Sequence, residues 1–549
     1  MITDHSKSKG LSEIKAPSQQ QLISLLEHYQ SGRFSEAEKL AISITKDFPK
    51  HQFAWKLLGA IFGQTNRKSE AVYAQQRAIL LSPQDFETHS NLGITLQKIG
   101  RLEEAVASYK KAISLNPNYA EANYNLGITF QDLGRLEEAV ISYKKAIALK
   151  SNYVEAHSNL GITLQELGRL EEAVISYEKA ISLKSDFAVA HYNLGITLKK
   201  LGKSDDAALC YQKAISLKPD YAEAHSNLGV TLKARGKLEE AAVSYRKAIE
   251  FKPDYAEAHN NLANALQELV RLDEAASSYK QAIALKPEFA EAFWNLHGIQ
   301  KTIQEAEHWI DKCLIADTNH EKAKLTKSAL RFYQGDNESY DSLMQSEFKK
   351  HSYMRSFSWV FGLPSLPLLH FNKWYFFDEI IKQSNTSRPF YEFGVWRASS
   401  FNYLIKIFKK GFGFDTFTGL PEDWNVGNHV EKKGSYPSDG NIPKIKGGEF
   451  IVGKFDDTLP GFFSKNRPLA SVINFDADLY SSTICALNFS KSVMDKDTIL
   501  IFDEFMMNES WELDEFKALN EFCSTNKFSY EVIAISFFTK QVAIKLIGI

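Results

Sequence analysis

Two groups of acidic residues in the C-terminal part of this 549-residue chain could bind a cation or move a proton. The first is Asp476-Ala477-Asp478 and the second is Asp503-Glu504, and each directly follows a run of apolar residues. Carboxylates that are crowded together repel one another unless they share a proton or a cation. Their oxygen atoms are hard ligands of the kind that magnesium prefers. A carboxylate that remains free of metal could take a proton as a general base.

A second set of residues has the chemistry of a site for a ligand that carries a ribose. Gly394 follows the apolar run 390–393, and glycine at such a turn lets a ligand approach the backbone closely. A helix that begins at Ser399 would present free backbone N–H groups at its first turn. Asp415 ends another apolar run, where its carboxylate could accept two hydrogen bonds from a ribose diol. Phe455, Asp456 and Asp457 follow a third run and could frame an adenine ring.

All of these residues are expected at one edge of an open parallel sheet. Continuous apolar runs that alternate with helical stretches are typical of buried parallel strands connected by helices. The predicted strands are 390–393, 412–415, 449–452, 471–475 and 498–502, followed by a hairpin of 530–537 and 541–547. The predicted helices are 371–383, 399–408 and 510–526. Ligands of such sheets bind beyond the carboxyl ends of the strands, which is where the acidic residues fall.

The N-terminal half has a different pattern, which repeats every 34 residues. A leucine followed by a small residue recurs at Leu58-Gly59, Leu92-Gly93, Leu126-Gly127, Leu160-Gly161, Leu194-Gly195, Leu228-Gly229 and Leu262-Ala263, and Leu296 continues the series. Small residues let helices approach closely, and Gly100, Gly134 and Gly168 stand where the first helix of a unit must end. The pattern resembles the tetratricopeptide repeat. It predicts an α-helical solenoid of about nine units over residues 18–323, with degenerate units at its ends.

One asparagine precedes the leucine in each unit from Leu92 to Leu296. The row consists of Asn91, Asn125, Asn159, Asn193, Asn227, Asn261 and Asn295. Such carboxamides could hold an extended protein or peptide partner through its backbone, and the row resembles the asparagine ladder of the O-GlcNAc transferase repeat domain. The alternative is that each asparagine bonds a neighbouring helix of the stack, or was copied by duplication. The sequence leaves both interpretations open.

Five motifs follow one another in the C-terminal part. They are Glu392-Phe393-Gly394-Val395-Trp396-Arg397, Phe414-Asp415-Thr416-Phe417-Thr418-Gly419-Leu420-Pro421, Phe455-Asp456-Asp457-Thr458-Leu459-Pro460, Asp476-Ala477-Asp478-Leu479-Tyr480 and Phe502-Asp503-Glu504-Phe505. In this order, over about residues 370–549, they resemble the macrocin O-methyltransferase family of S-adenosylmethionine-dependent enzymes. The resemblance implies a Rossmann-like α/β class I methyltransferase domain that transfers a methyl group to a hydroxyl of a sugar or glycan-like acceptor.

The resemblance also implies roles for single residues. The cofactor would be S-adenosylmethionine, contacted by Glu392, Gly394, Trp396, Ser399, Asp415 and Asp456. A divalent cation, usually Mg2+, would be held by Asp476, Asp503 and Glu504, and Asp478 would be the general base. Two positions depart from the family pattern, since Glu504 replaces an aspartate and Ala398-Ser399 replaces a pair of glycines.

The bulk composition limits the classes of partner. With 65 basic and 67 acidic residues, the chain has no charge excess that would favour nucleic acid or an anionic membrane. The four cysteines are far apart, which argues against a disulfide framework. There is no apolar run of about 18 residues and no hydrophobic stretch of the signal-peptide type at the N-terminus. These features predict a cytoplasmic protein without a membrane span.

The predicted organisation is a flexible segment 1–17, repeats over 18–323, a helical junction 324–369 and the methyltransferase-like domain 370–549. Residues 425–448 could be a lid over the site or a surface loop. Two functions fit this organisation. The protein is either an O-methyltransferase whose repeats recruit a partner or acceptor, or a protein-interaction scaffold with a degenerate, non-catalytic methyltransferase domain.

Overall fold

The computed structural model describes residues 16–425, 430–435, 438 and 440–549. Within the predicted lid 425–448, residues 426–429, 436–437 and 439 therefore lie outside the described residues. The chain divides into two compact units, Met1–Ala224 and His225–Ile549. In the described part, no helix is both long enough and apolar enough to cross a membrane.

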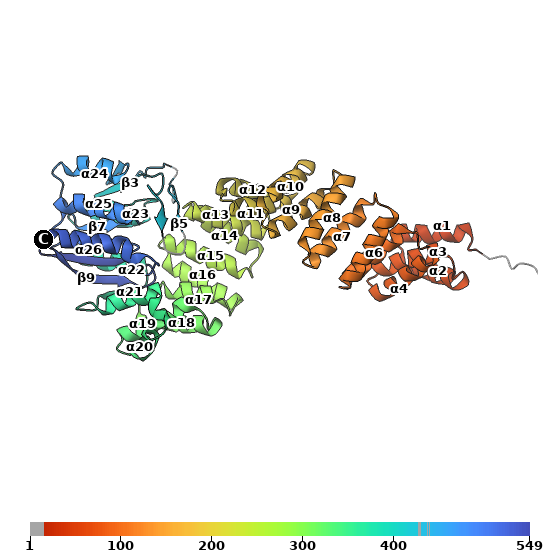
Figure 1. Ribbon diagram of the computed structural model, residues 1–549, viewed down its shortest axis with the longest axis horizontal. Helices are drawn as coiled ribbons and strands as arrows, with labels where there is room; N and C mark the ends of the chain where they lie inside the picture. Colours follow the sequence, from red (N-terminus) through yellow and green to blue (C-terminus); the bar gives the residue numbers. More distant parts are fainter. Residues whose placement is uncertain (1–15, 426–429, 436–437, 439) are drawn as a thin grey trace, which may run out of the picture. The chain divides into compact units, whose positions relative to one another are not determined.

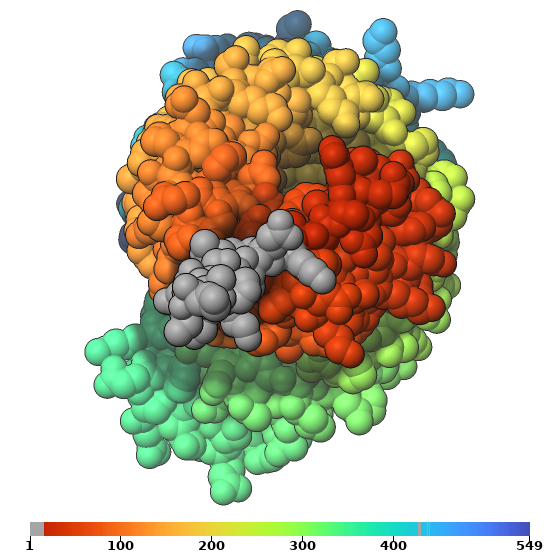
Figure 2. Space-filling model, turned by 90° about the vertical axis from the view of Figure 1, so that its right-hand side faces the viewer, coloured from red at the N-terminus to blue at the C-terminus, as the bar shows by residue number. Residues whose placement is uncertain are grey.

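The first unit consists of helix pairs. They are α1 (Gln19–Gln30), α2 (Phe34–Asp47), α3 (Gln52–Gln64), α4 (Lys68–Leu81), α5 (Phe86–Lys98), α6 (Leu102–Leu115), α7 (Ala120–Asp132), α8 (Leu136–Leu149), α9 (Val154–Glu166), α10 (Leu170–Leu183), α11 (Ala188–Lys200) and α12 (Ser204–Leu217), with α13 (Ala222–Ala234) beginning in this unit. Figure 2 shows the helices of residues 16–224, coloured from red to yellow, arranged around a hollow. This part is the predicted α-helical solenoid.

The repeated leucine–glycine pair is explained by helix packing inside each unit. Tyr143 of α8 is fully buried against α7. A Cβ atom added to Gly127 of α7 would lie 2.7 Å from the ring of Tyr143, so the glycine is needed for this close approach. The same contact recurs between Gly161 and Tyr177, again at 2.7 Å. The prediction that small residues mark the contact between the two helices of a unit is confirmed.

The turn after each first helix requires the left-handed backbone conformation. Gly134 and Gly168, predicted as helix ends, have φ angles of 71° and 73°. Val270 stands at the equivalent position of a later unit and has a φ angle of 63°. A β-branched residue is strained in this conformation, because its Cβ atom crowds the backbone.

The second unit contains the remaining helices of the array together with the sheet. Its first helices after α13 are α14 (Leu238–Phe251), α15 (Ala256–Glu268), α16 (Leu272–Leu285), α17 (Ala290–His297), α18 (Ile303–Ala316), α19 (Glu321–Tyr333), α20 (Glu338–Met344), the 3-10 helix η1 (Glu347–Lys350) and α21 (Ser352–Phe361). The helical junction predicted over 324–369 contains α20, η1 and α21, and it ends in a strand that the sequence did not reveal.

Eight strands form one mixed sheet (Figure 1). They are β1 (Leu368–His370), β2 (Phe390–Phe393), β3 (Gly411–Asp415), β6 (Gly448–Val452), β7 (Val472–Phe475), β8 (Ile499–Phe502), β9 (Ser529–Ser536) and β10 (Val542–Ile547). The order across the sheet is β1-β9-β10-β8-β7-β2-β3-β6, and β10 alone runs antiparallel to its neighbours. A separate two-stranded sheet pairs β4 (Trp424–Asn425) with β5 (Val430–Glu431).

Helices cover both faces of the large sheet. One face packs against α22 (Lys373–Lys382) and α23 (Ser399–Phe408), and the other against α24 (Phe455–Phe463), α25 (Tyr480–Ser490) and α26 (Glu515–Asn526). Short 3-10 helices η2 (Lys491–Val493) and η3 (Trp511–Leu513) precede β8 and α26. Side chains of the central strands alternate between the two faces, so that Ile501 and Phe502 of β8 belong to different core clusters. Because both faces are covered, these strands are continuous apolar runs, as predicted.

The register of the parallel strands places the acidic residues at one edge. Phe393, Phe475 and Phe502 are direct neighbours across β2, β7 and β8. The ladder continues for one more bond, since the backbone N–H of Asp476 donates to the carbonyl of Phe393 at 2.8 Å, and that of Asp503 donates to Phe475 at 3.0 Å. The predicted proximity of Asp476 and Asp503 is therefore confirmed.

Replacing Val270 with glycine should stabilise the second unit. Glycine adopts the left-handed conformation without strain, and we expect a gain of about 1 kcal/mol, reduced somewhat by the greater freedom of glycine in the unfolded chain. Midpoints of urea unfolding would measure the change. Gly202→Val, at the equivalent position with a φ angle of 77°, is the matched control and should lower stability. An unchanged or lower midpoint for Val270→Gly would contradict the strain argument.

Candidate functional site

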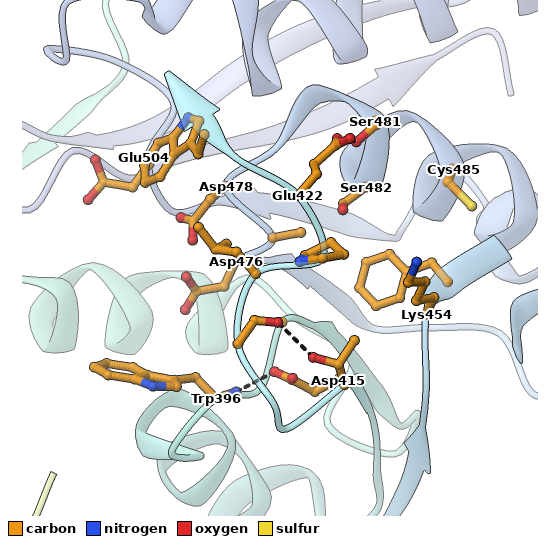
Figure 3. Close-up of a pocket in the computed structure, with 18 of the residues that line it drawn as sticks. Trp396, Asp415, Glu422, Lys454, Asp476, Asp478, Ser481, Ser482, Cys485 and Glu504 are labelled. Carbon is orange, nitrogen blue, oxygen red and sulfur yellow. Dashed lines mark hydrogen bonds between the residues drawn. The ribbon is translucent and has the colours of Figure 1, made fainter. Parts of the chain in front are cut away.

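A cavity of about 430 Å³ lies at the carboxyl edge of the sheet (Figure 3). The loops after β2, β3, β6, β7 and β8 all contribute to its wall. Among the residues predicted for the site, those that line the cavity are Gly394, Trp396, Asp415, Asp456, Asp476, Asp478, Asp503 and Glu504. Phe455, predicted beside the adenine, lines it too, whereas Asp457 does not. Lys454 and Cys485 were not predicted but line it as well. Glu392 and Ser399 do not line this cavity.

The turn after β2 is the most constrained part of the wall. Gly394 has a φ angle of 87°, and a Cβ atom there would lie 1.8 Å from the backbone oxygen of Asp476, so only glycine fits. Trp396 and Ala398 also have positive φ angles, 44° and 60°. Asp478, in the loop after β7, has a φ angle of 59°. Backbone strain of this kind costs energy and is concentrated at ligand sites, because the surrounding structure must hold it in place.

Asp415 joins two of these loops. Its Oδ2 atom accepts a hydrogen bond from the backbone N–H of Trp396 at 2.7 Å, which Figure 3 shows as a dashed line. Its Oδ1 atom accepts from the backbone N–H of Phe417 at 2.6 Å. Each carboxylate oxygen has a second acceptor site, so the predicted bonds to a ribose diol remain chemically open to Asp415. The structure therefore shows Asp415 holding the wall of the cavity, and its contact with a ribose diol stays a prediction.

Glu392 is buried beneath the turn. Its side chain is 1% exposed, and its Oε2 atom has no hydrogen-bond partner among the described residues. Burial, reinforced by the negative charge of Asp476, raises the pKa of Glu392 well above its usual value. A buried acid without a partner is costly, and such a residue can donate or accept a hydrogen bond when a polar ligand arrives.

Asp456 lies at the start of α24, where the chain leaves β6. Its Oδ1 atom accepts a hydrogen bond from the thiol of Cys485 on α25 at 3.2 Å. Burial and this bond raise the pKa of Cys485 to about 12, so the side chain is a neutral thiol and not a nucleophile at neutral pH. The contact brings α24 and α25 together at the cavity.

Four carboxylates crowd the side of the cavity formed by β7 and β8. In Figure 3 the carboxylates of Asp476 and Asp478 point to the side on which Glu504 lies. Burial and the charge of Asp503 raise the pKa of Asp476 to about 8. Burial, with the charge of Asp476, raises the pKa of Asp478 well above its usual value, and burial also raises that of Glu504. The cluster therefore favours proton binding, as expected of adjacent acids.

Two lysines that sequence reasoning missed lie against this cluster. The Nζ atom of Lys373, on α22, is 2.8 Å from Oδ1 of Asp503 and 3.6 Å from Oδ2 of Asp476. Burial opposes a charge on Lys373, but the two aspartates outweigh this effect and raise its pKa above the usual value. Lys540, in the turn between β9 and β10, donates from Nζ to Oε2 of Glu504 at 2.6 Å. Gln541 donates to Oδ1 of Asp503 at 2.7 Å.

The Mg2+ site implied by the family resemblance stays a prediction. Its three residues, Asp476, Asp503 and Glu504, lie together, but each carboxylate faces an ammonium group. Among the described residues, no group of three or more His, Cys, Asp or Glu side chains is arranged to hold a metal ion. A magnesium ion would fit only after the lysines were displaced, because ammonium and magnesium compete for the same oxygen atoms.

Glu515 is a further acid that the sequence did not single out. It begins α26, is 1% exposed, and neither of its carboxylate oxygens has a hydrogen-bond partner in the described part of the chain. Burial, with the charge of Asp478 next in size, raises its pKa well above the usual value. Only its burial behind the cluster identifies it, since a glutamate at the start of a helix is otherwise an ordinary surface residue.

The asparagine row is placed on the first helices of the array. Asn91, Asn125, Asn159, Asn193, Asn227 and Asn261 are half-buried, and Asn295 is buried. Asn159 donates to the hydroxyl of Tyr124 in the preceding repeat at 3.1 Å. Asn295 donates to Oδ1 of Asn260, also in the preceding repeat, at 3.3 Å. For these two residues the structure shows the alternative interpretation, a bond between neighbouring repeats.

The acidic cluster should make stability depend on pH. Asp476 has a usual pKa of 3.8 and a native pKa of about 8, so the native state holds a proton that the unfolded chain releases. Stability should therefore be greatest below about pH 4 for this group and should fall as pH rises towards 8. Melting temperatures between pH 5 and 8 would show a decline that Asp476→Asn reduces. Asp457→Asn, an exposed residue of α24, should leave the decline as it is in the wild type. An identical decline in both variants would contradict this assignment.

Comparison with known proteins identifies one part of the chain. A family model described as TPR repeat matches residues 96–134, 130–168, 163–202 and 231–270. Models described as tetratricopeptide repeat match 25–86, 188–221, 210–242 and 256–289. No curated protein matches the chain.

Several solved structures are similar to part of the chain. The crystal structure of MamA is 30% identical, covers 30% of this chain and 97% of its own, and has a TM-score of 0.29. YrrB, described as a TPR protein with an unusual peptide-binding site, is 27% identical over 34% of this chain and 95% of its own, with a TM-score of 0.31. A tetratricopeptide repeat protein from Parabacteroides merdae is 18% identical, covers 45% of this chain and 99% of its own, and has a TM-score of 0.35. On the evidence of the family models, the segment from residue 25 to residue 289 is a tetratricopeptide repeat array, a type of scaffold for protein or peptide interactions.

Proposed function

We propose that the protein is an S-adenosylmethionine-dependent O-methyltransferase whose tetratricopeptide repeats recruit a protein partner or the acceptor. The observation that carries the proposal is the place of the cavity in the sheet. In the order β6-β3-β2-β7-β8, chain order reverses between β2 and β7. In doubly wound sheets, ligands that carry a nucleoside bind at this switch point, beyond the carboxyl ends of the strands. Gly394 and Asp476 lie on either side of it.

The residues around the cavity suit the cofactor. The tight turn at Gly394 lets a ligand approach the backbone, Asp415 offers acceptors for a ribose diol, and Asp456 lies on the far side for an adenine. Glu392 does not line the cavity, but it lies beneath the turn and has a buried carboxylate oxygen without a hydrogen-bond partner among the described residues. S-adenosylmethionine, when bound, supplies an electrophilic methyl group, so the chain has to orient the acceptor and remove its proton.

Asp478 is the proposed general base. It lines the cavity beside Asp476, and its raised pKa means that it retains a strong affinity for a proton. A hydroxyl held against Asp478 would give up its proton to that carboxylate as its oxygen formed the bond to the methyl carbon, while the methyl–sulfur bond broke and its electron pair stayed on the sulfur. Lys373 and Lys540 keep positive charge next to the cluster, which favours the ionised form of these acids over the form that burial alone would give. The acceptor is proposed to be a sugar or glycan-like hydroxyl compound.

A scaffold without catalysis is the second candidate. The repeat array is the part that family models match, and the lysines on the acidic cluster occupy the positions where a catalytic cation would bind. In this function the sheet would act only as a folded support at the end of the array. Binding of the cofactor separates the two candidates.

Cofactor binding should depend on Asp415. Calorimetry of the full chain with S-adenosylmethionine, with and without Mg2+, should show binding to the wild type. Asp415→Asn should weaken it roughly tenfold or more, because the variant loses a charged acceptor and the anchor of Trp396. Asp457→Asn is the matched control and should bind like the wild type. Absence of binding to the wild type under both conditions would leave the scaffold as the function.

Asp478→Asn should separate binding from chemistry. The asparagine has nearly the same shape but cannot take up the hydroxyl proton, so methyl incorporation into an acceptor should fall by about a hundredfold or more. Its affinity for S-adenosylmethionine should change by less than about threefold. The wild-type rate should rise with pH until Asp478 is ionised, since burial raises its pKa, and the variant should lack this rise. Equal rates for variant and wild type would remove Asp478 from the mechanism.

A further inference from the structure

Arg397 does not line the cavity, and its side chain binds the repeat array instead. It follows Trp396 in the turn after β2, and its guanidinium donates to the backbone carbonyls of Lys233, at 3.4 Å, and Ala234. These carbonyls belong to the last turn of α13, where a cation is favourable. The carbonyl of Lys233 also accepts from the backbone N–H of Gly236 at 2.8 Å, and its second lone pair is available to Arg397. The side chain of Arg397 lies against Gly236, where any Cβ atom would collide with it at 2.1 Å. The contact is therefore built from both parts of the second unit.

The next two repeats also contact the sheet domain, through α22. Gln267 stands 34 residues after Lys233, and its carbonyl accepts from the indole N–H of Trp374, on α22, at 3.0 Å. Lys301 stands a further 34 residues on, and its ammonium lies 5.2 Å from the ring centre of Tyr375, also on α22. Lys233 and Gln267 thus present equivalent carbonyls, in the last turns of α13 and α15, whereas Lys301 contacts α22 from the segment between α17 and α18.

The turn that Arg397 anchors is the strained one. Trp396 and Ala398, on either side of it, have positive φ angles, and the backbone N–H of Trp396 reaches Asp415 from this conformation. Two non-glycine residues in the left-handed region strain the turn unless contacts from outside it compensate. The charge-assisted bonds from Arg397 to α13 are such contacts. Trp396 also lines a second cavity, shared with Gly236 and Glu268 of the array.

We infer that Arg397 is a positioning residue, through which the last repeats of the array hold the turn of residues 394–398 in the shape that forms the cavity. The array is then part of the site and does more than recruit a partner. If the proposed function holds, a partner that shifts α13 or α15 changes cofactor affinity, and the cofactor changes partner affinity by the same factor. This last step rests on the proposed function, whereas the positioning role does not.

Hydrogen exchange of the full chain tests the positioning role without any ligand. Arg397→Ala should raise amide exchange in residues 395–400 about tenfold or more, because the turn loses a charge-assisted anchor. Arg397→Lys keeps the charge but not the forked donor, and it should give a smaller rise. Arg246→Ala is the matched control, since Arg246 is an exposed arginine of α14 paired with Glu274. It should leave exchange in the turn as in the wild type.

Unchanged exchange in Arg397→Ala would overturn the inference. An equal rise in Arg246→Ala would overturn it too, since the turn would then respond to general loosening of the repeats. Cofactor titrations of the same variants separate this result from the proposed function. A wild type that does not bind S-adenosylmethionine defeats the proposed function, while the exchange data still decide the role of Arg397.

Discussion

The candidate site depends on the balance of charge at the carboxyl edge of the sheet. The parallel alignment of β7 and β8 brings Asp476 and Asp503 together, and Asp478 and Glu504 follow them directly. Carboxylates this close cannot all be ionised without positive partners, because each desolvated charge raises the cost of the next. Lys373 and Lys540 supply two positive charges. The pKa values of Asp476, Asp478 and Glu504 are raised, so that protons can neutralise the negative charge that the lysines do not.

This balance of charge explains why α22 and the β9–β10 hairpin belong to the site, although neither contributes one of its acids. Lys373 comes from α22, and Lys540 from the turn of the β9–β10 hairpin. The hairpin places β10 antiparallel beside β8, so its turn reaches the same edge as the end of β8. The indole of Trp374, next to Lys373, bonds α15 of the array. The ammonium group that neutralises Asp503 is thus on a helix that the repeats help to hold.

Sequence reasoning found the strands and the acidic residues, because both leave local patterns. Buried parallel strands are apolar runs with acids directly after them, as at Asp476 and Asp503. The partners of those acids leave no such pattern. Lys373 belongs to an amphipathic helix and looks like a surface lysine, and Lys540 looks like an ordinary turn residue. The antiparallel β9–β10 hairpin was predicted, but the edge strand β1 was missed, since apolar periodicity shows that a segment is buried and not which strand lies beside it.

The repeats also show what the sequence predicts and what it does not. Their period predicts every helix pair, because one contact, such as that of Gly127 with Tyr143, recurs unchanged. It does not predict which repeat has an additional task. Lys233 and Gln267 occupy an ordinary position at the end of a first helix, and the equivalent Lys199 gives no sequence signal that separates it from them. What distinguishes the later repeats is an arginine far along the chain, in a turn whose strain requires an external anchor. A repeated backbone carbonyl thus takes on a specific contact, because a single non-repeated side chain, Arg397, binds it.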